Sequence, residues 1–238
     1  MEKRIFADLD NTLIFSHRYD IGDRCLVEML NGKEQAYMTR RGYEYLQKTD
    51  PDVLVPVTSR TLVQYQRVSL YDDGRNPKYA LIDNGGILLI NGKPDDLWLS
   101  ETEALMKDDM DALKQYEKAC EDKAVIKWQD DMVLFIKSDE PYELFSSKAE
   151  EYGLMVFNHF DKIYVCSGKL TKGNAVRRFK DRYPADLTIV AGDSEADLSM
   201  VSEADKAYLD IKLKQQVRDT GNVFFVDPLF IAETIFGR

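Results

Sequence analysis

Two aspartates follow a short apolar segment near the start of the chain, in the run Asp8-Leu9-Asp10-Asn11-Thr12-Leu13. Residues 5–9 are predicted to form a buried strand, and ligands of an open parallel sheet bind beyond the carboxyl ends of its strands. Carboxylates two residues apart can face the same crevice, where one could attack an electrophile while the other transfers a proton. A simple polar turn is the alternative interpretation, because Asp and Asn are common after strands.

Two more segments could hold a phosphoryl group. Thr58-Ser59-Arg60 closes a second apolar strand, where a hydroxyl and a backbone N–H could bind a phosphoryl oxygen, although Ser and Thr are also ordinary helix caps. Lys172 lies where a helix is predicted to begin, and a cation at that end of the helix dipole costs a few tenths to about 1 kcal/mol. A nearby anion would offset this cost; for a solvated surface lysine, the alternative, screening makes the cost small.

A further pair of carboxylates follows the predicted strand 187–191, in the run Gly192-Asp193-Ser194-Glu195-Ala196-Asp197. Ser194 and Asp197 have the spacing of a capping box in its acidic form, which would explain Asp197 without any ligand. The capping box does not explain Asp193, which follows the strand directly. We expect Asp193 at the end of its strand, in the same layer of the sheet as Asp8. Carboxylates gathered at one edge need a cation to neutralise them, and Mg²⁺ is the usual ion when phosphate is the partner.

Strands and helices alternate in the first and the last third of the chain, which predicts an α/β fold with a doubly wound parallel sheet. The predicted strands are 5–9, 53–57, 79–82, 187–191, 207–209 and 223–226, and the predicted helices are 39–48, 61–71, 172–183, 195–203, 211–219 and 228–236. Thr39 is the candidate cap of the first helix. Asn31-Gly32 predicts a hairpin over 25–38 with a type I′ turn, which could act as a flap over the site or merely lengthen the edge of the sheet.

The middle of the chain has a different pattern, and we expect an inserted α+β unit there. A second Asn-Gly turn at 91–92 predicts another hairpin, and residues 100–121 have apolar positions at helical spacing. Strands are predicted at 132–137, 155–158 and 163–166, with a helix at 141–152. The expected division is therefore a core of residues 1–85 and 167–238 and an insertion of residues 86–166.

Composition narrows the expected partners and the compartment. The 238 residues carry a net charge of −10, with a pI of about 4.8, so nucleic acids and anionic membranes are not expected as partners. Three cysteines, Cys25, Cys120 and Cys166, form no CxxC pair, which favours a reducing cytoplasm over a disulfide scaffold or a zinc site. No apolar run approaches the length of a membrane span. The oligomeric state is not predicted.

Taken in order, the four polar segments resemble the motifs of the haloacid dehalogenase superfamily. The chain has Asp-x-Asp-x-Thr after the first strand, Thr after the second, Lys before a later helix, and Gly-Asp-x-x-x-Asp after the next strand. The insertion resembles the type II cap of the Cof-like and sucrose-phosphatase-like branch, and the runs 84–86 and 170–175 resemble that branch's signatures. The resemblance implies a Rossmann-like core with an α+β cap.

The resemblance also implies a reaction, the hydrolysis of a small phosphorylated metabolite, with a sugar phosphate as the best single guess. Asp8 would be the nucleophile that forms an aspartyl phosphate, and Asp10 would be the general acid and base. Thr58, Ser59 and Lys172 would bind the phosphoryl group. In such a site the cations neutralise the charge that spreads over the transferring group.

The same resemblance implies a magnesium site formed by Asp8, the backbone carbonyl of Asp10 and Asp193, with Asp197 supporting the water shell of the ion. Ala196 stands where the branch usually has Asn, so a contact near the metal is missing or is supplied elsewhere. Two other functions stay open. A phosphosugar mutase would pass the phosphoryl group to a second sugar hydroxyl, and a non-catalytic binding protein could use the same fold.

Overall fold

The structure, a computed structural model, describes residues 2–159, 162–217 and 221–237. The chain divides into two compact units, one formed by Met1–Asp95 with Thr171–Arg238 and the other by Asp96–Leu170. The second unit thus interrupts the first once along the chain. It begins ten residues later than the expected insertion at 86, and it ends at 170 in place of 166.

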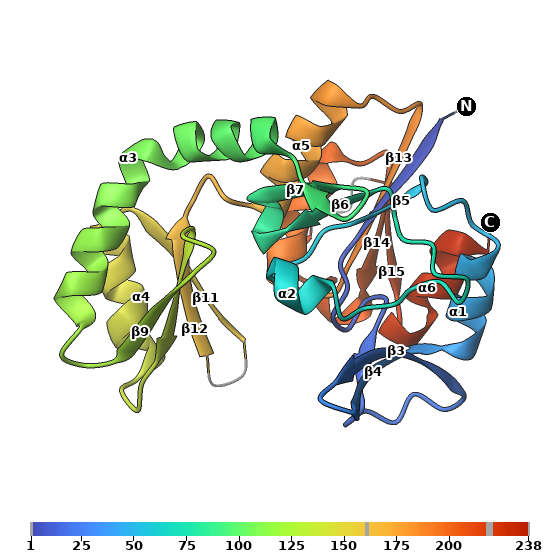
Figure 1. The fold of residues 1–238 in the computed structure, drawn as a ribbon, viewed down its shortest axis with the longest axis horizontal. Helices are drawn as coiled ribbons and strands as arrows, with labels where there is room; N and C mark the ends of the chain where they lie inside the picture. The colour runs from blue at the N-terminus through green and yellow to red at the C-terminus, as the bar shows by residue number, and fades with distance from the viewer. Residues whose placement is uncertain (1, 160–161, 218–220, 238) are drawn as a thin grey trace. The chain divides into compact units, whose positions relative to one another are not determined.

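The first unit is built on a five-stranded parallel sheet with the order β15-β14-β13-β1-β5 (Figure 1). The strands are β1 (Lys3–Ala7), β5 (Leu54–Pro56), β13 (Leu187–Gly192), β14 (Lys206–Asp210) and β15 (Val223–Val226). Along β1, Ile5 and Ala7 join the core beneath α1 (Arg40–Gln47) and α6 (Pro228–Phe236). Phe6 points the other way, and its ring centroid lies 5.4 Å from that of Phe179 in α5 (Lys172–Arg182). Helices on both faces confirm the predicted α/β fold.

A second, antiparallel sheet in this unit contains the predicted hairpin. It has the order β2-β4-β3, with β2 (Phe15–Ser16), β3 (Arg24–Leu30) and β4 (Lys33–Thr39). Asn31 and Gly32 both have positive φ, 52° and 74°, as a type I′ turn requires. Thr39 does precede α1, but its side chain makes no capping hydrogen bond.

Strand β3 of the hairpin pairs with the segment that follows α2 (Leu62–Tyr65). Glu28 forms a bridge with Val68, and the Ser69 amide donates to the Val27 carbonyl at 2.8 Å. This pairing explains why α2 ends well short of the predicted 61–71, since residues 68 and 69 are extended against the hairpin. Val27 and Val68 both belong to the main core, so the hairpin is packed into the unit.

A third sheet explains the late start of the second unit. It contains β6 (Tyr79–Ile82), β7 (Ile87–Ile90) and β8 (Lys93–Pro94), in that order and antiparallel, with a short 3₁₀ helix, Asp83–Gly85, before β7. The expected hairpin around Asn91-Gly92 is present, but it pairs with β6 and belongs to the first unit. The first unit therefore includes residues 86–95, which the predicted division assigned to the insertion.

The second unit has a four-stranded antiparallel sheet in the order β11-β12-β10-β9, and Figure 1 shows its two helices on one face. Its elements are α3 (Asp96–Cys120), β9 (Val125–Gln129), β10 (Val133–Lys137), α4 (Tyr142–Glu151), β11 (Leu154–His159) and β12 (Lys162–Ser167). The Tyr116 hydroxyl of α3 donates to the Phe145 carbonyl of α4 at 3.2 Å. Strand β9 was not predicted.

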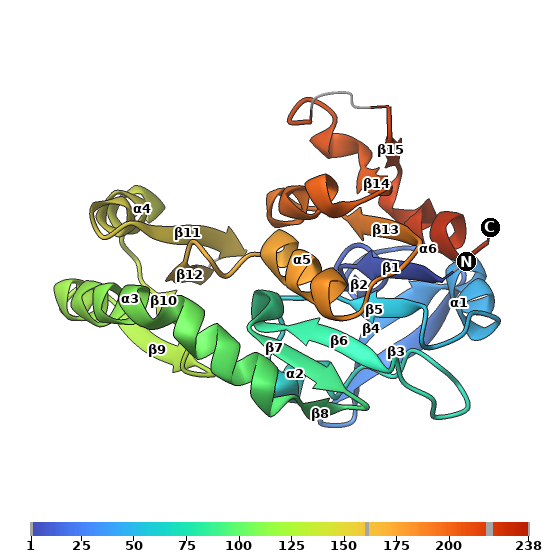
Figure 2. The same ribbon diagram turned by 90° about the horizontal axis from the view of Figure 1, so that it is seen from above.

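Two 3₁₀ helices complete the first unit, and Figure 2 shows α5 beside the central sheet. Residues Glu195–Glu203 form the first, η2, where a helix was predicted. The predicted helix 211–219 is reduced to η3 (Ile211–Leu213), and its residues 218–219 lie outside the described part of the chain. Within the described ranges, none of the helices combines the length and the apolarity that a bilayer-spanning segment needs.

Candidate active site

The strand ends bring the predicted site residues to one edge of the central sheet. Ala7 of β1 is in register with Ala191 of β13, and the Asp8 amide donates to the Ala191 carbonyl at 3.0 Å. Asp193 follows β13 directly. On the other side of β1, the Val57 amide donates to the Ala7 carbonyl at 2.8 Å, so Thr58 leaves β5 at the same edge.

Three carboxylates form a buried group that we call the acidic cluster, made of Asp8, Asp193 and Asp197. They are 6%, 4% and 0% exposed, and one oxygen from each lies within 4.8 Å of the other two. Burying charged carboxylates side by side is costly, because each loses solvation and repels its neighbours. The cluster is therefore a place where the chain tolerates electrostatic strain, as functional sites do.

Lys172 supplies a cation inside the cluster. Its Nζ lies 2.7 Å from Asp8 Oδ1 and 2.6 Å from Asp197 Oδ1, and its side chain is 4% exposed. Lys172 is the first residue of α5, and a Cβ on the next residue, Gly173, would come within 2.0 Å of the Ser199 carbonyl. Only glycine lets α5 approach η2 this closely. The predicted cost of a lysine at a helix N-terminus is thus offset by two carboxylates.

Asp197 uses its second oxygen to hold the loop. Oδ2 accepts hydrogen bonds from the backbone amides of Asp193 and Ser194, at 3.1 and 2.9 Å, and from the Ser194 hydroxyl at 2.7 Å. A Cβ at Gly192 would lie 2.3 Å from the Cβ of Asp197, so the turn requires glycine there. Asp197 therefore caps η2, as the capping-box spacing predicts, and its other oxygen contacts Lys172.

Burial and neighbouring charges shift the pKa values of the acidic cluster and of Lys172. Burial raises the pKa of the Asp8 carboxyl well above its ordinary value; Lys172 lowers it, and the other two carboxylates of the cluster raise it further. Burial also raises the pKa of Asp193, despite a hydrogen bond from Lys212. Burial would lower the pKa of Lys172, but Asp197 and Asp8 raise it overall. Because the donors are all oxygens, a hard divalent cation such as Mg²⁺ fits this site.

Asp193 is also held from outside the cluster. Its Oδ1 accepts from the Thr12 hydroxyl at 3.3 Å, and its Oδ2 lies 2.9 Å from Lys212 Nζ. Lys212 also contacts Asp210 Oδ2 at 3.1 Å. We did not predict a role for Lys212 or Asp210. The signal available was their place directly after a predicted parallel strand, 207–209, which ends at the same edge.

Asp10 does not join the acidic cluster through its side chain. Both of its oxygens accept hydrogen bonds from Arg60, from Nε and from Nη2, each at 2.8 Å. Arg60 Nη2 also donates to Glu28 Oε2 at 2.9 Å, and Arg67 Nε donates to Glu28 Oε1 at 2.9 Å. We call these four residues the arginine network. Glu28 was missed, although it is the single charged residue in the otherwise apolar run 25–30.

Thr58 and Ser59 differ in their surroundings. Thr58 is 1% exposed, its amide donates to the Leu81 carbonyl at 2.9 Å, and its hydroxyl accepts from the Arg60 amide at 3.2 Å. The Thr58 amide is therefore already used within the protein, which leaves its hydroxyl as the group that could donate to a phosphoryl oxygen. Ser59 is exposed.

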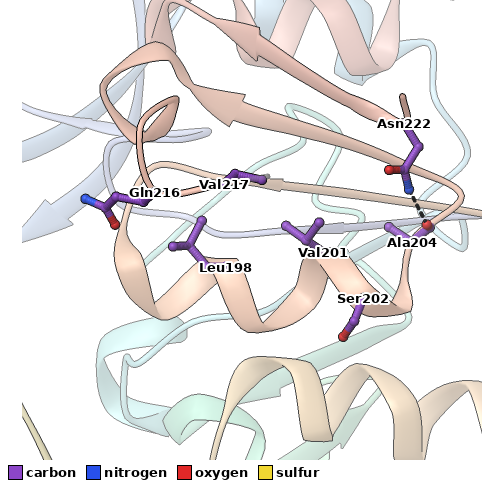
Figure 3. Close-up of a pocket in the computed structure, with 7 residues that line it drawn as sticks. All are labelled: Leu198, Val201, Ser202, Ala204, Gln216, Val217 and Asn222. Atoms are coloured by element: carbon purple, nitrogen blue, oxygen red, sulfur yellow. Dashed lines mark hydrogen bonds between the residues drawn. The ribbon is translucent and has the colours of Figure 1, made fainter. Parts of the chain in front are cut away.

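A pocket of about 430 Å³, with none of these residues in its lining, lies along η2 (Figure 3). Leu198, Val201 and Val217 contribute to its wall, and Asn222 donates to the Ala204 carbonyl at 3.0 Å beside it. The described residues that line it include no charged side chain. It therefore lacks the groups that phosphoryl chemistry requires, and the acidic cluster remains the candidate site.

Solved structures share this arrangement of elements. A sucrose-phosphatase from Synechocystis, in complex with sucrose and phosphate, aligns with a TM-score of 0.66 at 15% identity, over 100% of this chain and 98% of that chain. A phosphatase of the HAD superfamily from Bacteroides thetaiotaomicron aligns with a TM-score of 0.64 at 15% identity, over 100% and 96%. A trehalose-6-phosphate phosphatase from Aspergillus fumigatus aligns with a TM-score of 0.51 at 13% identity, over 100% and 94%.

No protein-family model matches the sequence, and no curated protein sequence matches it either. The structural similarity extends over nearly the full length of each protein compared. At these identities the similarity shows how the chain folds, and it agrees with the resemblance of the four motifs. The chain has the fold of the phosphatases of the haloacid dehalogenase superfamily.

Proposed function

We propose that the protein is a magnesium-dependent phosphatase that hydrolyses a small phosphate monoester through an aspartyl phosphate on Asp8. The observation that carries this proposal is the placement of Asp8. It lies at the carboxyl end of β1, an interior strand of the parallel sheet, is buried with two further carboxylates, and contacts Lys172 at 2.7 Å. A nucleophilic carboxylate, a cation for the phosphoryl oxygens and a set of metal ligands are the parts that this reaction needs.

The first step transfers the phosphoryl group to the protein. An Asp8 oxygen forms a bond to phosphorus, the bond between phosphorus and the ester oxygen breaks, and Asp10 gives that oxygen a proton. Lys172, which is held between Asp8 and Asp197, would stabilise the charge on the transferring group.

The second step restores Asp8. Asp10 now takes a proton from water, the water oxygen bonds to phosphorus, and the bond from phosphorus to Asp8 breaks, which releases phosphate. Asp10 thus serves as acid and then as base, so its side chain must reach the reacting oxygen in both steps. Thr58, and with it Ser59, is proposed to bind phosphoryl oxygens.

The fit of Mg²⁺ rests on the donor set and on the shortage of positive charge at the acidic cluster. Asp8, Asp193 and the backbone carbonyl of Asp10 would hold the ion, and Asp197 would orient its water shell. When bound, Mg²⁺ would supply Lewis-acid stabilisation of the phosphoryl oxygens. It would also favour the ionised form of Asp8, which is the form that can attack phosphorus.

We propose a phosphorylated sugar as the substrate, with the Asp96–Leu170 unit acting as a cap. Two similar structures are named a sucrose-phosphatase and a trehalose-6-phosphate phosphatase, which supports a sugar phosphate here. A cap limits the room for the leaving group and excludes water. The net charge of −10 also disfavours long polyanions. The reducing environment that three free cysteines favour makes the cytoplasm the proposed compartment.

A substrate panel tests this proposal. The purified protein is assayed for phosphate release from sugar phosphates, nucleotides, a phosphopeptide and a 5′-phosphorylated oligonucleotide, with and without Mg²⁺. We expect the highest kcat/KM on a sugar phosphate and no release without a divalent ion. A macromolecular substrate ranking first would contradict the cap. A lack of release from every compound, p-nitrophenyl phosphate included, would contradict the phosphatase itself.

A further inference from the structure

The arginine network shares one guanidinium between two carboxylates. Arg60 binds Asp10 with two hydrogen bonds and Glu28 with one, and Arg67 binds the other oxygen of Glu28. The network has two cations and two anions, so its charges are matched. Asp10 is 40% exposed and Arg60 is 12% exposed, whereas Glu28 is 4% exposed. Glu28 is thus the buried anchor, and Asp10 is the member that faces solvent.

The position of Glu28 reverses the usual pattern of a strand. Its neighbours Leu26, Met29 and Leu30 are 40%, 44% and 38% exposed, whereas the carboxylate is buried. The register of β3 against β4 shifts on both sides of Glu28, and such bulges re-aim a side chain. Exposing apolar side chains in order to bury a charged one costs stability, and such local conflicts concentrate at functional sites.

The contacts of Asp10 conflict with its proposed role in the resting structure. Arg60 has only N–H donors, so an Asp10 oxygen that accepts from Arg60 is not the one that carries a proton to a leaving group. Asp10 must therefore turn away from Arg60 to act. Arg60 is mostly buried, and it would lose its carboxylate partner at that moment unless another is already in place.

We propose that Glu28 is a positioning residue that lets Asp10 leave Arg60. Glu28 keeps Arg60 and Arg67 neutralised while Asp10 turns to the substrate. Without the charge of Glu28, Asp10 is the remaining carboxylate of the network, and its departure would leave two guanidinium groups without a carboxylate. Asp10 is then held at Arg60. This inference rests on the proposed phosphatase function and adds a residue from the hairpin to it.

The test compares two leaving groups in the variant Glu28→Gln. Expulsion of p-nitrophenolate needs little help from an acid, whereas glycerol 2-phosphate loses a poor leaving group that must be protonated. We expect kcat/KM on glycerol 2-phosphate to fall by about tenfold or more, because general acid catalysis contributes roughly 10²–10⁴-fold. On p-nitrophenyl phosphate it should fall by less than about threefold. An equal fall on both substrates would overturn the proposal, because lost packing would affect both.

Two further variants separate positioning from stability. Arg67→Gln removes the contact between Arg67 and the buried Glu28 but keeps the hydrogen bond from Arg60 to Glu28. The ratio of the two kcat/KM values should therefore match that of the parent. The double variant Glu28→Gln/Arg67→Gln restores the charge balance, which protects folding, yet leaves Asp10 as the partner of Arg60. We expect it to keep the defect on glycerol 2-phosphate. A parental ratio in the double variant, or a defect in Arg67→Gln as large as in Glu28→Gln, would overturn the role of Glu28.

The outcome is distinguishable from a failure of the proposed function. If the parent protein releases phosphate from p-nitrophenyl phosphate and Asp8→Asn does not, the phosphatase stands whatever Glu28 does. If the parent is active and the ratio of the two substrates does not move in Glu28→Gln, the positioning role alone fails. Thermal melting of each variant confirms that the comparison is made on folded protein.

Discussion

Two groups of charged side chains each include an aspartate that follows β1, and they differ in how their charges are matched. The arginine network joins two carboxylates to two guanidinium groups through four hydrogen bonds. The acidic cluster has three carboxylates around the ammonium of Lys172, and Lys212 adds a second cation together with a fourth carboxylate, Asp210. With every carboxyl ionised, two negative charges are left unmatched among the described residues of this group.

The difference indicates what each group is built to do. A charge-matched network is complete by itself, so its members hold one another in place. An unmatched cluster is completed only when a cation enters, and two unmatched charges suit a divalent ion. The two aspartates of the Asp8-Leu9-Asp10 run therefore face different environments. Asp8 belongs to the acidic cluster, and Asp10 belongs to the arginine network.

The largest effect is expected from Asp8→Asn. An amide cannot accept the phosphoryl group, so turnover should fall by on the order of 10⁴-fold or more. The melting temperature should not fall, because the change removes one of the unmatched negative charges of the acidic cluster. Asp73→Asn, at an exposed ion pair with Arg75, is the matched control and should keep full activity. Retention of more than trace activity by Asp8→Asn would mean that another group is the nucleophile.

The second largest effect on turnover is expected from a change in the arginine network. Asp10→Asn should lower turnover by about 10²–10⁴-fold, the range for general acid and base groups. If the larger part of its role is to activate water, phosphoenzyme should accumulate in this variant. Full activity of Asp10→Asn on glycerol 2-phosphate would show that proton transfer comes from elsewhere.

Metal binding should separate the members of the acidic cluster. Asp193→Asn should weaken Mg²⁺ binding by at least about tenfold in a calorimetric titration, and chelation of the metal should stop activity in the parent. Asp197→Asn should weaken it less and lower the melting temperature more, since Asp197 holds the loop through its second oxygen. If Asp197→Asn loses stability but keeps its Mg²⁺ affinity, Asp197 acts as a capping residue alone.

The smallest effect is expected at Lys212, whose side chain is 57% exposed. Lys212→Met removes a cation that contacts Asp193, so Mg²⁺ should bind about threefold to tenfold more tightly, as expected for a partly screened charge. Lys214→Met makes the same change in net charge two residues further on, and it should leave the affinity unchanged. Weaker Mg²⁺ binding in Lys212→Met would show that Lys212 serves mainly to orient Asp193.

The acidic side of the site was largely predictable from the sequence, and the arginine network was not. Asp8, Asp193 and Lys172 each follow or begin a predicted element, and the ends of parallel strands meet at one edge whatever the details of packing. Glu28 reaches the site from a hairpin in another sheet, through a bulge and a bridge to Val68. Such pairings depend on contacts between distant segments, which no local pattern encodes.

The fold shows the same limit. The predicted alternation of strands and helices is confirmed, yet the predicted helix 61–71 is shortened where residues 68 and 69 pair with the hairpin. In the predicted helix 211–219, the only helix among the described residues is η3. The predicted insertion included the hairpin after Gly86, whereas β7 pairs with β6 and belongs to the first unit. No role was predicted for Lys212 because it lies within the predicted helix 211–219, where a lysine is typical of a solvated helix face.

The most direct test of the account is to find the phosphoryl group on Asp8. The parent and Asp10→Asn are mixed with p-nitrophenyl phosphate and Mg²⁺, quenched in acid during turnover, digested and mapped by mass spectrometry. We predict a single phosphorylated peptide that contains Asp8, more abundant in Asp10→Asn and absent when Mg²⁺ is left out or Asp8 is replaced by Asn. Turnover without any adduct, or an adduct on another residue, would contradict the central claim.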